Sequence, residues 1–545
     1  MDLAARIVHK EASTYQSWLK TLLSYAMGGI CFILFFDYCT LTDSGRTLVQ
    51  KVRQEISDCF SEVDFHFFLK PVLLMFGVYF LGILTIIRAN FLYMDDIARS
   101  IGGYRGWYNW SRYVSEFLSV IIHGDTNLTD ISPLPQLLAI LILAVSSVLL
   151  VYIIGNKKIT TTRLLASIPL GLFPFFFDCL TFKFDAPYMA LSILASIIPF
   201  LFITRKKAFF FGSVISLLIM CMTYQAVSGV YMLIVVILCF LDWNNRKKSN
   251  KEILSFLGIA VLAFCFAMLF FRFFLMKPFD EQESGYVSNA MHPLPDIIFG
   301  TLTNIKNYAM TINHDLGIIW KIGIIFVCIF FITKSIRVGS REKIFSFFVS
   351  ILAIGLSFIL SYGVYSLLAI PSYGPRALIG FNVFLAILCI SVVSDYKKIA
   401  TVVVFTLNWC LFVFAFSYGN ALADQARYAE FRACILLHDL NILYPDHQNK
   451  EDSTIQLKNS IDYTPIVKNI AKHYPIVERL VPKQLGEKFW DCLYLLHFNY
   501  IEYKMINFPV VTSFDFDTLN LPVVLDSYYH TIQSDGNHIL IVLKH

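Results

Sequence analysis

Apolar runs divide most of the chain into segments long enough to cross a membrane. A spanning helix needs about 20 predominantly apolar residues. Runs of this kind lie at 71–89, 135–154, 164–177, 187–203, 208–222, 226–241, 253–275, 316–333, 344–369, 377–394 and 399–417. Several are shorter than the ideal, and 164–177 is the weakest. The pattern predicts an all-α polytopic transmembrane bundle with about eleven core spans.

Lysine and arginine gather in alternate connectors between these runs. Such connectors face the cytoplasm by the positive-inside rule. The residues are Lys157, Lys158, Arg163, Arg205, Lys206, Lys207, Arg246, Lys247, Lys248, Lys251, Lys334, Arg337, Arg341, Lys343, Lys397 and Lys398. The intervening connectors carry few basic residues for their length, and we expect them to face outward: 90–134, 178–186, 223–225, 276–315 and 370–376.

The two ends of the chain differ from this body. A further apolar run at 21–37 conflicts with the charge pattern if it spans, so we expect an interfacial helix there rather than an external N-terminus. After residue 418 polar residues return, with helical spacing at 420–440 and strand patterns at 521–526 and 538–543. We therefore predict three parts: an N-terminal extension at 1–70, a transmembrane body at 71–418 and an outward soluble α/β domain at 419–545.

Composition supports a membrane protein and excludes several classes. Hydrophobic residues make up 57% of the 545 residues and charged residues 15%, which is too apolar for a soluble globular protein. The net charge of +5 is explained by topology, so we expect no nucleic-acid partner. The twelve cysteines show no zinc spacing, and no metal site is expected. Cys434 and Cys492 lie in the polar tail, where an oxidising compartment would allow a disulfide.

The most informative polar segment is Tyr93-Met-Asp-Asp-Ile-Ala-Arg99, directly after an apolar run. Charged groups are costly in hydrocarbon and mark solvent-side or bundle-facing sites. Helical spacing places Asp95 and Arg99 on one face, with Asp96 about 100° away. Asp95 or Asp96 is a candidate general base. The alternative is a solvated helix N-terminus carrying favourable acidic residues.

The same outward loop carries further candidate binding residues. Arg99, Arg105 and Arg112 suggest an anionic ligand, since guanidinium groups donate bidentate hydrogen bonds to phosphate; the alternative is contact with lipid headgroups. Trp107 is either an interfacial anchor or a platform for a sugar ring. Glu116 follows Arg112 by four residues.

Three more polar clusters occur at outward ends of spans. Lys183 and Asp185 place opposite charges at a helix start, Tyr224-Gln225 forms a short turn, and Arg376 follows Pro371-Ser-Tyr-Gly-Pro375. Each alone is more typical of a topological flank, but their agreement on one side indicates a site. No nucleotide-binding loop, metalloprotease motif or serine-hydrolase elbow occurs in convincing context.

In order and spacing, these residues resemble bacterial and phage O-antigen glucosyltransferases, the serotype-converting glucosyl transferase II family. The resemblance covers roughly residues 70 to 430. It rests on 93–99, Gly103-Tyr-Arg-Gly-Trp107, Ser115-Glu116, Asp130-Ile-Ser-Pro-Leu-Pro135, Phe182-Lys-Phe-Asp185, Tyr224-Gln225 and Pro375-Arg376. The family usually has Gly-Arg where this chain has Ser111-Arg112. The C-terminal domain resembles the family only in place and size.

The resemblance implies a GT-C-type enzyme of the bacterial inner membrane with a periplasmic active site and C-terminal domain. Such an enzyme moves glucose or a related hexose from undecaprenyl phosphate to an O-antigen or lipopolysaccharide acceptor. It implies no cofactor, and functional coupling to a flippase and a donor-synthesising enzyme. Asp95 or Asp96 would be the base; Arg99, Arg105, Arg112 or Arg376 would bind phosphate; and the sugars would contact Trp107, Glu116, Lys183, Asp185, Tyr224 and Gln225.

Two other classes fit the same apolar bundle. A flippase or transporter of a lipid-linked sugar should show broken midplane helices or a repeat that relates its halves, and neither is visible in the sequence. An O-antigen polymerase would act in the same compartment and alter chain length rather than add a side branch.

Overall fold

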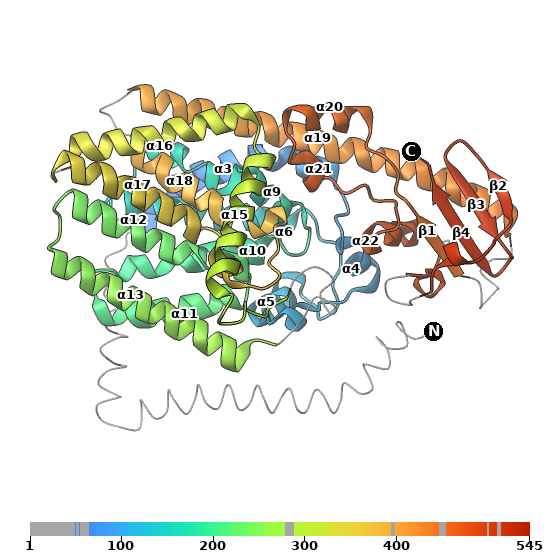
Figure 1. The fold of residues 1–545 in the computed structure, drawn as a ribbon, viewed down its shortest axis with the longest axis horizontal. Coiled ribbons are helices and arrows are strands. Elements are labelled where there is room, and N and C mark those ends of the chain that lie inside the picture. The colour runs from blue at the N-terminus through green and yellow to red at the C-terminus, as the bar shows by residue number, and fades with distance from the viewer. Residues whose placement is uncertain are drawn as a thin grey trace.

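The computed structural model describes Gln50, Gln54 and residues 65–277, 288–339, 341–393, 398–445, 454–498, 501–508 and 514–544. The apolar run at 21–37 and most of the predicted N-terminal extension lie outside the described residues. What the structure describes is a helical bundle joined to a small mixed domain that contains one sheet (Figure 1).

Seven described helical segments are long and apolar enough to cross a membrane. Four are single helices or parts of them: Phe67–Ala89 in α3 (Phe65–Ala89), α6 (Leu134–Ile154), α16 (Ile318–Val338) and α17 (Lys343–Leu360). The others are Gln225–Asn244 across η3 (Gln225–Val227) and α12 (Val230–Asn244), Asn250–Leu275 across α13 (Asn250–Phe270) and η4 (Phe271–Leu275), and the long helix α19 (Lys398–Leu443). The predicted run at 164–177 corresponds to a bent pair, Thr161–Leu172 and Pro174–Thr181, which would raise the number to eight. The count of eleven stays a prediction.

The remaining predicted spans form shorter helices inside the bundle. α10 (Ala186–Ile197) continues into η2 (Ile198–Phe202), α11 covers Lys206–Cys221, and α18 covers Gly380–Val392. Every residue of α18 is buried. A helix that is apolar on all sides is typical of the centre of a bundle, so α18 packs among the other helices rather than against lipid.

Close helix packing is clearest where α19 crosses α3. A Cβ atom added to Gly419 would lie 2.3 Å from Oγ1 of Thr85, and that hydroxyl donates to the carbonyl of Ala415 at 3.1 Å. Small residues let helix backbones approach closely in membranes. Gly419 therefore fixes α19 against the helix that leads into the Asp95 segment.

The helix α19 runs without a break from the bundle into the C-terminal domain (Figure 1). The predicted boundary at residues 418 and 419 therefore falls within one continuous helix. Beyond the bundle, α19 buries Ala429, Ala433, Leu436 and Leu440, whose spacing forms one apolar stripe. This stripe packs in the core of the C-terminal domain.

The domain's sheet has the order β1-β4-β3-β2. Its strands are β1 (Thr454–Lys458), β2 (Val523–Asp526), β3 (His530–Ser534) and β4 (His538–Leu543); β1 and β4 are parallel and the other pairs antiparallel. Strands β2 and β4 confirm the two predicted strand patterns. Short helices α20 (Pro465–His473), α21 (Val477–Leu480) and α22 (Phe489–Cys492) complete the domain.

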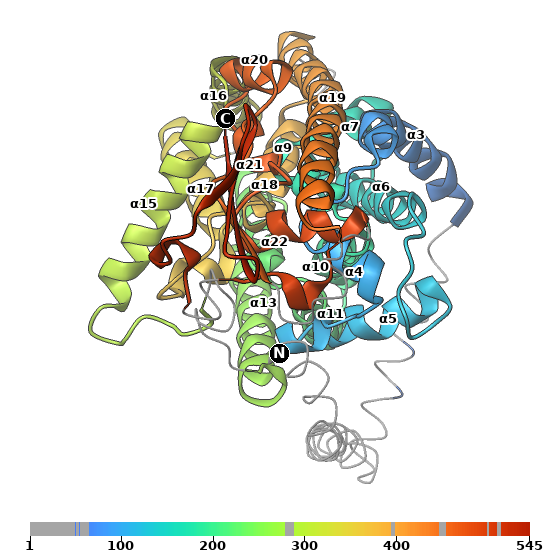
Figure 2. The ribbon, with the colours of Figure 1, turned by 90° about the vertical axis from the view of Figure 1, so that its right-hand side faces the viewer.

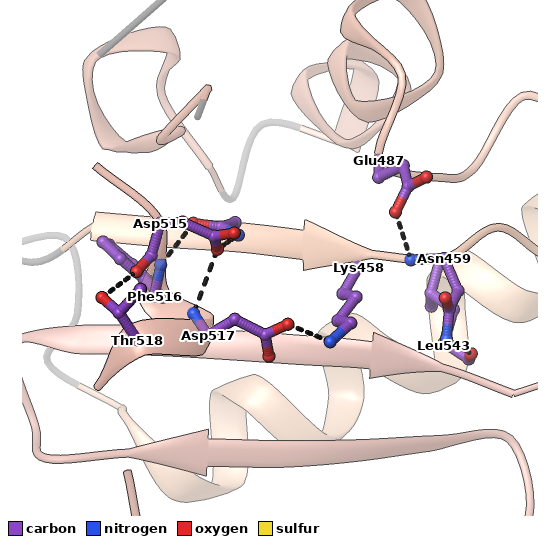
Figure 3. A network of polar contacts seen from close by, with 9 residues as sticks. Lys458, Asn459, Glu487, Asp515, Phe516, Asp517, Thr518 and Leu543 are labelled. Carbon is purple, nitrogen blue, oxygen red and sulfur yellow. Dashed lines mark hydrogen bonds and ion pairs between the residues drawn. The ribbon is translucent and has the colours of Figure 1, made fainter. Parts of the chain in front are cut away.

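Polar contacts hold the loop around 514–518 to β1 (Figure 3). Lys458 pairs with Asp517, and the side-chain amide of Gln456 donates to Asp515 at 2.7 Å. The C-terminal cysteines contribute no cross-link, because Cys434 and Cys492 are both free thiols. The disulfide that the sequence allowed between them is therefore not formed. Cys434 is exposed, whereas Cys492 is buried.

The C-terminal domain packs directly on α4 (Asp96–Gly102), the helix that carries the acidic motif (Figure 2). Ile97 of α4 belongs to the same buried cluster as the α19 stripe and the strands. The amide of Gln484 donates to the carbonyl of Leu92 at 2.8 Å. The domain thus braces the acidic segment from the side opposite the bundle.

Candidate active site

The acidic motif forms a compact charged cluster at the end of the bundle where α3 finishes and α6 begins. We call this the Asp95 end. Asp95 precedes the first residue of α4, and Arg99 lies one turn later. As the spacing predicts, Arg99 Nη2 contacts Asp95 Oδ2 at 3.1 Å. Its other terminal nitrogen contacts Asp185 Oδ2 at 3.0 Å, so one guanidinium holds two carboxylates.

Trp107 completes the enclosure of Arg99. The guanidinium carbon lies 4.3 Å from the centroid of the indole ring, and the indole N–H donates to Asp185 Oδ1. A cation over an aromatic face is stabilised by the ring quadrupole, more strongly when desolvated. Trp107 is 1% exposed and therefore acts here as packing for Arg99, with its polar edge already engaged.

Asp95 and Asp96 occupy different environments, which separates the two candidate bases. Asp96 is 0% exposed, and its Oδ2 accepts from the backbone N–H of Lys183 at 3.0 Å. Burial and the neighbouring charge of Asp95 raise the pKa of Asp96 well above its usual value. The Asp95 side chain is 20% exposed; burial raises its pKa, and the charge of Arg99 opposes the rise. Asp96 therefore anchors the loop before α10, and Asp95 is the more accessible carboxylate.

Unpartnered polar atoms concentrate in this cluster. Asp95 Oδ1 and Arg99 Nε are buried without a hydrogen-bond partner among the described residues. Leaving a buried polar group unsatisfied costs about 1–3 kcal/mol, and such groups are typical of strained or substrate-binding sites. The cluster therefore has capacity to bind a polar ligand.

A second group of charges involves Asp178, which our sequence reasoning did not select. Asp178 lies in α9 (Pro174–Thr181), is 3% exposed, and accepts from the Tyr93 hydroxyl at 2.8 Å. It also accepts from the backbone N–H of Arg376 at 3.0 Å. The available signal was a carboxylate immediately after Phe175-Phe-Phe177, because an ionisable residue within an apolar run marks a site.

Arg376 and Arg112 both contact Tyr224. The guanidinium carbon of Arg112 is 4.8 Å from the Tyr224 ring centroid, and the Tyr224 hydroxyl donates to the Arg376 carbonyl at 3.3 Å. The Arg376 guanidinium lies 4.7 Å from the Phe182 ring centroid. Gln225 donates from its side chain to the Trp110 carbonyl at 3.0 Å. The structure therefore brings the separate sequence clusters together at one end of the bundle.

Arg112 lines a largely apolar cavity of about 290 Å³. Gln225 and Arg272 also line it, together with Phe264, Met268 and Phe271 along the α13–η4 span. Arg112 Nε is buried without a hydrogen-bond partner among the described residues. Arginine side chains beside an apolar wall suit a lipid whose phosphate lies at the membrane surface.

The remaining candidate residues form ion pairs, but their partners differ from the neighbours that the spacing along the sequence suggested. Glu116 pairs with Arg105, at 3.3 Å, rather than with Arg112. Lys183 pairs with Asp130 at 2.8 Å, so Lys183 and Asp185 do not pair with each other. In both cases the partner is set by loop folding and not by separation along the chain.

Ser111 has the left-handed backbone conformation that favours glycine, with φ of 59°. Its hydroxyl accepts from the backbone N–H of Lys277 at 2.7 Å. Ser111 therefore forms the turn before Arg112 in a conformation that glycine adopts more easily, and it adds one hydrogen bond.

No group of three or more histidine, cysteine, aspartate or glutamate residues suited to a metal ion occurs within the described ranges. The expectation of a metal-independent site stays a prediction.

Comparison with known proteins places this site in a family context. The family model "Glucosyl transferase GtrII" matches residues 84–393, more than half of the chain. An uncharacterized 55.3 kDa protein in the gtrB 5′ region of Salmonella phage P22 is 23% identical over 409 residues, covering 72% of this chain and 82% of the phage protein. No solved structure matches significantly. The matched segment contains Asp95, Asp178, Arg112 and Arg376.

Proposed function

The chain belongs to the glucosyl transferase GtrII family, and we propose that it moves glucose or a related hexose from an undecaprenyl-phosphate sugar to an O-antigen or lipopolysaccharide acceptor. The observation that carries this proposal is the Asp95–Arg99–Asp185 cluster at the same end of the bundle as an apolar cavity lined by Arg112. A base, a cationic group and an apolar cavity are the parts that such a transfer needs.

The positive-inside rule supports a periplasmic location for the Asp95 end. Basic residues concentrate at the opposite end, where α6, α12, α16 and α18 finish. A lipid-linked donor used at the outer face would have to be made and carried there by other proteins. Functional coupling to a donor-synthesising enzyme and a flippase is therefore part of the proposal.

Asp95 serves as the general base in the proposed reaction. Its side chain is 20% exposed, and the carboxylate accepts the proton of the acceptor hydroxyl as that oxygen bonds to the anomeric carbon. Arg99 holds Oδ2 and fixes the orientation of the carboxylate. Asp96 positions the backbone of Lys183 and does not contact substrate.

Arg112 holds the phosphate of the donor; Arg376, like Arg112, contacts Tyr224. As the bond between the anomeric carbon and the phosphate oxygen breaks, its electron pair passes to that oxygen and undecaprenyl phosphate leaves. Fixed guanidinium groups stabilise the charge that develops there. The displacement occurs in one step and inverts the anomeric configuration. Trp107, Glu116, Lys183, Asp185, Tyr224 and Gln225 shape the sugar-binding surroundings.

Analysis of the polysaccharide tests the function. Lipopolysaccharide is compared between cells with and without the chain, all supplied with the enzyme that makes the lipid-linked sugar. A new side-branch sugar at constant chain length is expected. Altered chain length would indicate a polymerase, and unchanged covalent structure would indicate transport; either result overturns the proposal.

A further inference from the structure

A second cavity, which is polar, lies at the other end of the bundle. We call this end the Lys334 end. It has a volume of about 180 Å³ and is bounded by the last turns of α6, α12, α16 and α18. The cavity and the active site lie at opposite ends of α6. This helix has 21 residues, and at 1.5 Å per residue it is about 30 Å long. A sugar donor bound near Arg112 therefore does not extend its headgroup into this cavity.

Three cationic side chains, Arg163, Lys247 and Lys334, line the cavity, and no carboxylate side chain from the part of the chain that the structure describes lines it. Arg163 donates to the Gly155 carbonyl at 3.3 Å, and Lys334 donates to the Ser391 carbonyl at 2.6 Å. These are neutral acceptors, so the hydrogen bonds orient the cations without neutralising them. The positive-inside rule explains why basic residues occur at this end of the bundle. It does not explain why three of them line the same cavity.

The wall of the cavity also carries an unsatisfied hydroxyl. Ser391 is 9% exposed, and its Oγ has no hydrogen-bond partner among the described residues. Beside it, the buried Asn244 donates from its amide to the Ser335 carbonyl at 3.0 Å. A Cβ on Gly339 would lie 2.6 Å from this amide nitrogen. The glycine permits this tight wall, and the free hydroxyl supplies a donor for a ligand.

We propose that this cavity binds the phosphate of an anionic membrane lipid headgroup. Phosphate oxygens accept charge-assisted hydrogen bonds from arginine and lysine, and basic pockets between spanning helices at the cytoplasmic side suit such headgroups. The mouth of the cavity lies where helices leave the membrane, so the acyl chains remain in the bilayer. The bound headgroup joins the ends of four helices that are distant in sequence.

Binding to the purified full-length protein in detergent tests this proposal. Native mass spectrometry is used to measure retained phosphatidylglycerol, with phosphatidylcholine as the neutral lipid and inorganic phosphate as a soluble competitor. We expect preferential retention of phosphatidylglycerol. The variants Arg163→Gln and Lys334→Gln should each weaken it about tenfold, the effect of losing one charge-assisted bond. The matched control is Lys207→Gln, because Lys207 is exposed at the same end and does not line the cavity.

Three results would overturn the proposal. Equal retention of both lipids would show no charge selection, and equal weakening by Lys207→Gln would show a diffuse surface effect. Displacement of the lipid by inorganic phosphate at equal concentration would assign the cavity to a free anion. If Lys334→Gln does not fold, Arg163→Gln decides the outcome, since Arg163 lies in the first turn of the short helix α7 (Thr161–Ala166).

Discussion

Arg99 at the Asp95 end and Arg432 in the C-terminal domain are both buried arginines, but their surroundings differ. Arg432, on α19, is 1% exposed. It donates to the Tyr428 hydroxyl at 2.7 Å and to the carbonyls of Tyr529 and Lys544 at 2.6 and 2.8 Å. Arg99 instead contacts two carboxylates, and its Nε has no hydrogen-bond partner among the described residues.

The difference separates structural from functional burial. Arg432 is hydrogen-bonded to neutral groups of α19 and of the residues next to β3 and β4, so it fixes the sheet against the helix. A buried charge is tolerated when it is fully hydrogen-bonded. Around Arg99, two carboxylates of like charge are held close together, and several polar atoms have no hydrogen-bond partner among the described residues. This arrangement weakens the local structure and leaves polar atoms that can bind substrate. Substitutions at the Asp95 end should therefore mainly lower activity, whereas substitution of Arg432 should mainly lower stability.

Removal of the proposed base should have the largest effect. Asp95→Asn keeps the size of the side chain but cannot accept a proton at ordinary pH. We expect transfer to fall about 10²–10⁴-fold with little change in melting temperature, measured with purified enzyme and lipid-linked donor. Asp125→Asn is the matched control, because Asp125 is exposed on the same loop and accepts only local hydrogen bonds. Full activity of Asp95→Asn would remove this residue from the mechanism.

Loss of the structural arginine should act on stability. Arg432→Gln removes a charge that holds two carbonyls and a hydroxyl, and we expect a loss of about 3 kcal/mol in the free energy of unfolding. Thermal unfolding followed by circular dichroism gives the measurement. Arg427→Gln, an exposed arginine on the same helix, should differ little from the parent. Equal stability of both variants would contradict the role assigned to Arg432.

The phosphate-binding role of Arg112 predicts an intermediate effect on catalysis. Arg112→Gln should lower kcat/KM for the lipid donor about tenfold to a hundredfold, the range expected for one charge-assisted hydrogen bond. The fold should be retained because Arg112 is only half-buried. Donor and acceptor are varied separately. An effect confined to the acceptor would assign Arg112 to the other substrate.

The environment of Asp95 predicts a shifted pH profile. Burial raises the pKa of Asp95, and transfer needs the ionised form, so activity should decline on acidification at a pH above the ordinary value of about 3.9 for aspartate. Asp185→Asn should move this decline to lower pH, since the Asp185 charge contributes to the raised pKa of Asp95. The measurement is kcat/KM against pH. A decline at the ordinary aspartate value would contradict the raised pKa.

The smallest effect is expected at the turn before Arg112. Ser111→Gly relieves a left-handed conformation that costs a non-glycine residue about 1–2 kcal/mol, and it also loses the hydrogen bond to Lys277, worth about 1 kcal/mol. The two terms nearly cancel, so stability should change by less than about 1 kcal/mol. Thermal unfolding measures the change. A larger loss would show that the hydroxyl has a further role.

Several features follow from local pattern and were predicted from the sequence. Apolar length predicted the helices now seen as α3, α6, α13 and α16, because a span must satisfy its backbone within one helix. Alternation predicted β2 and β4. The separation of four residues predicted the contact between Asp95 and Arg99. The family was also identifiable, because the order and spacing of short polar motifs is a property of the chain itself.

Other features depend on contacts between distant segments, and only the tertiary structure decided them. Asp95 and Asp96 are adjacent in sequence, yet only packing of the loop at Lys183 buries Asp96. Asp178 reaches Tyr93 and the Arg376 backbone across three elements. The pairing of Lys183 with Asp130, and the convergence of Arg163, Lys247 and Lys334 on one cavity, likewise arise from helix ends far apart along the chain. Periodicity fixes which face of an element is apolar, whereas the partner of a charge depends on which elements meet.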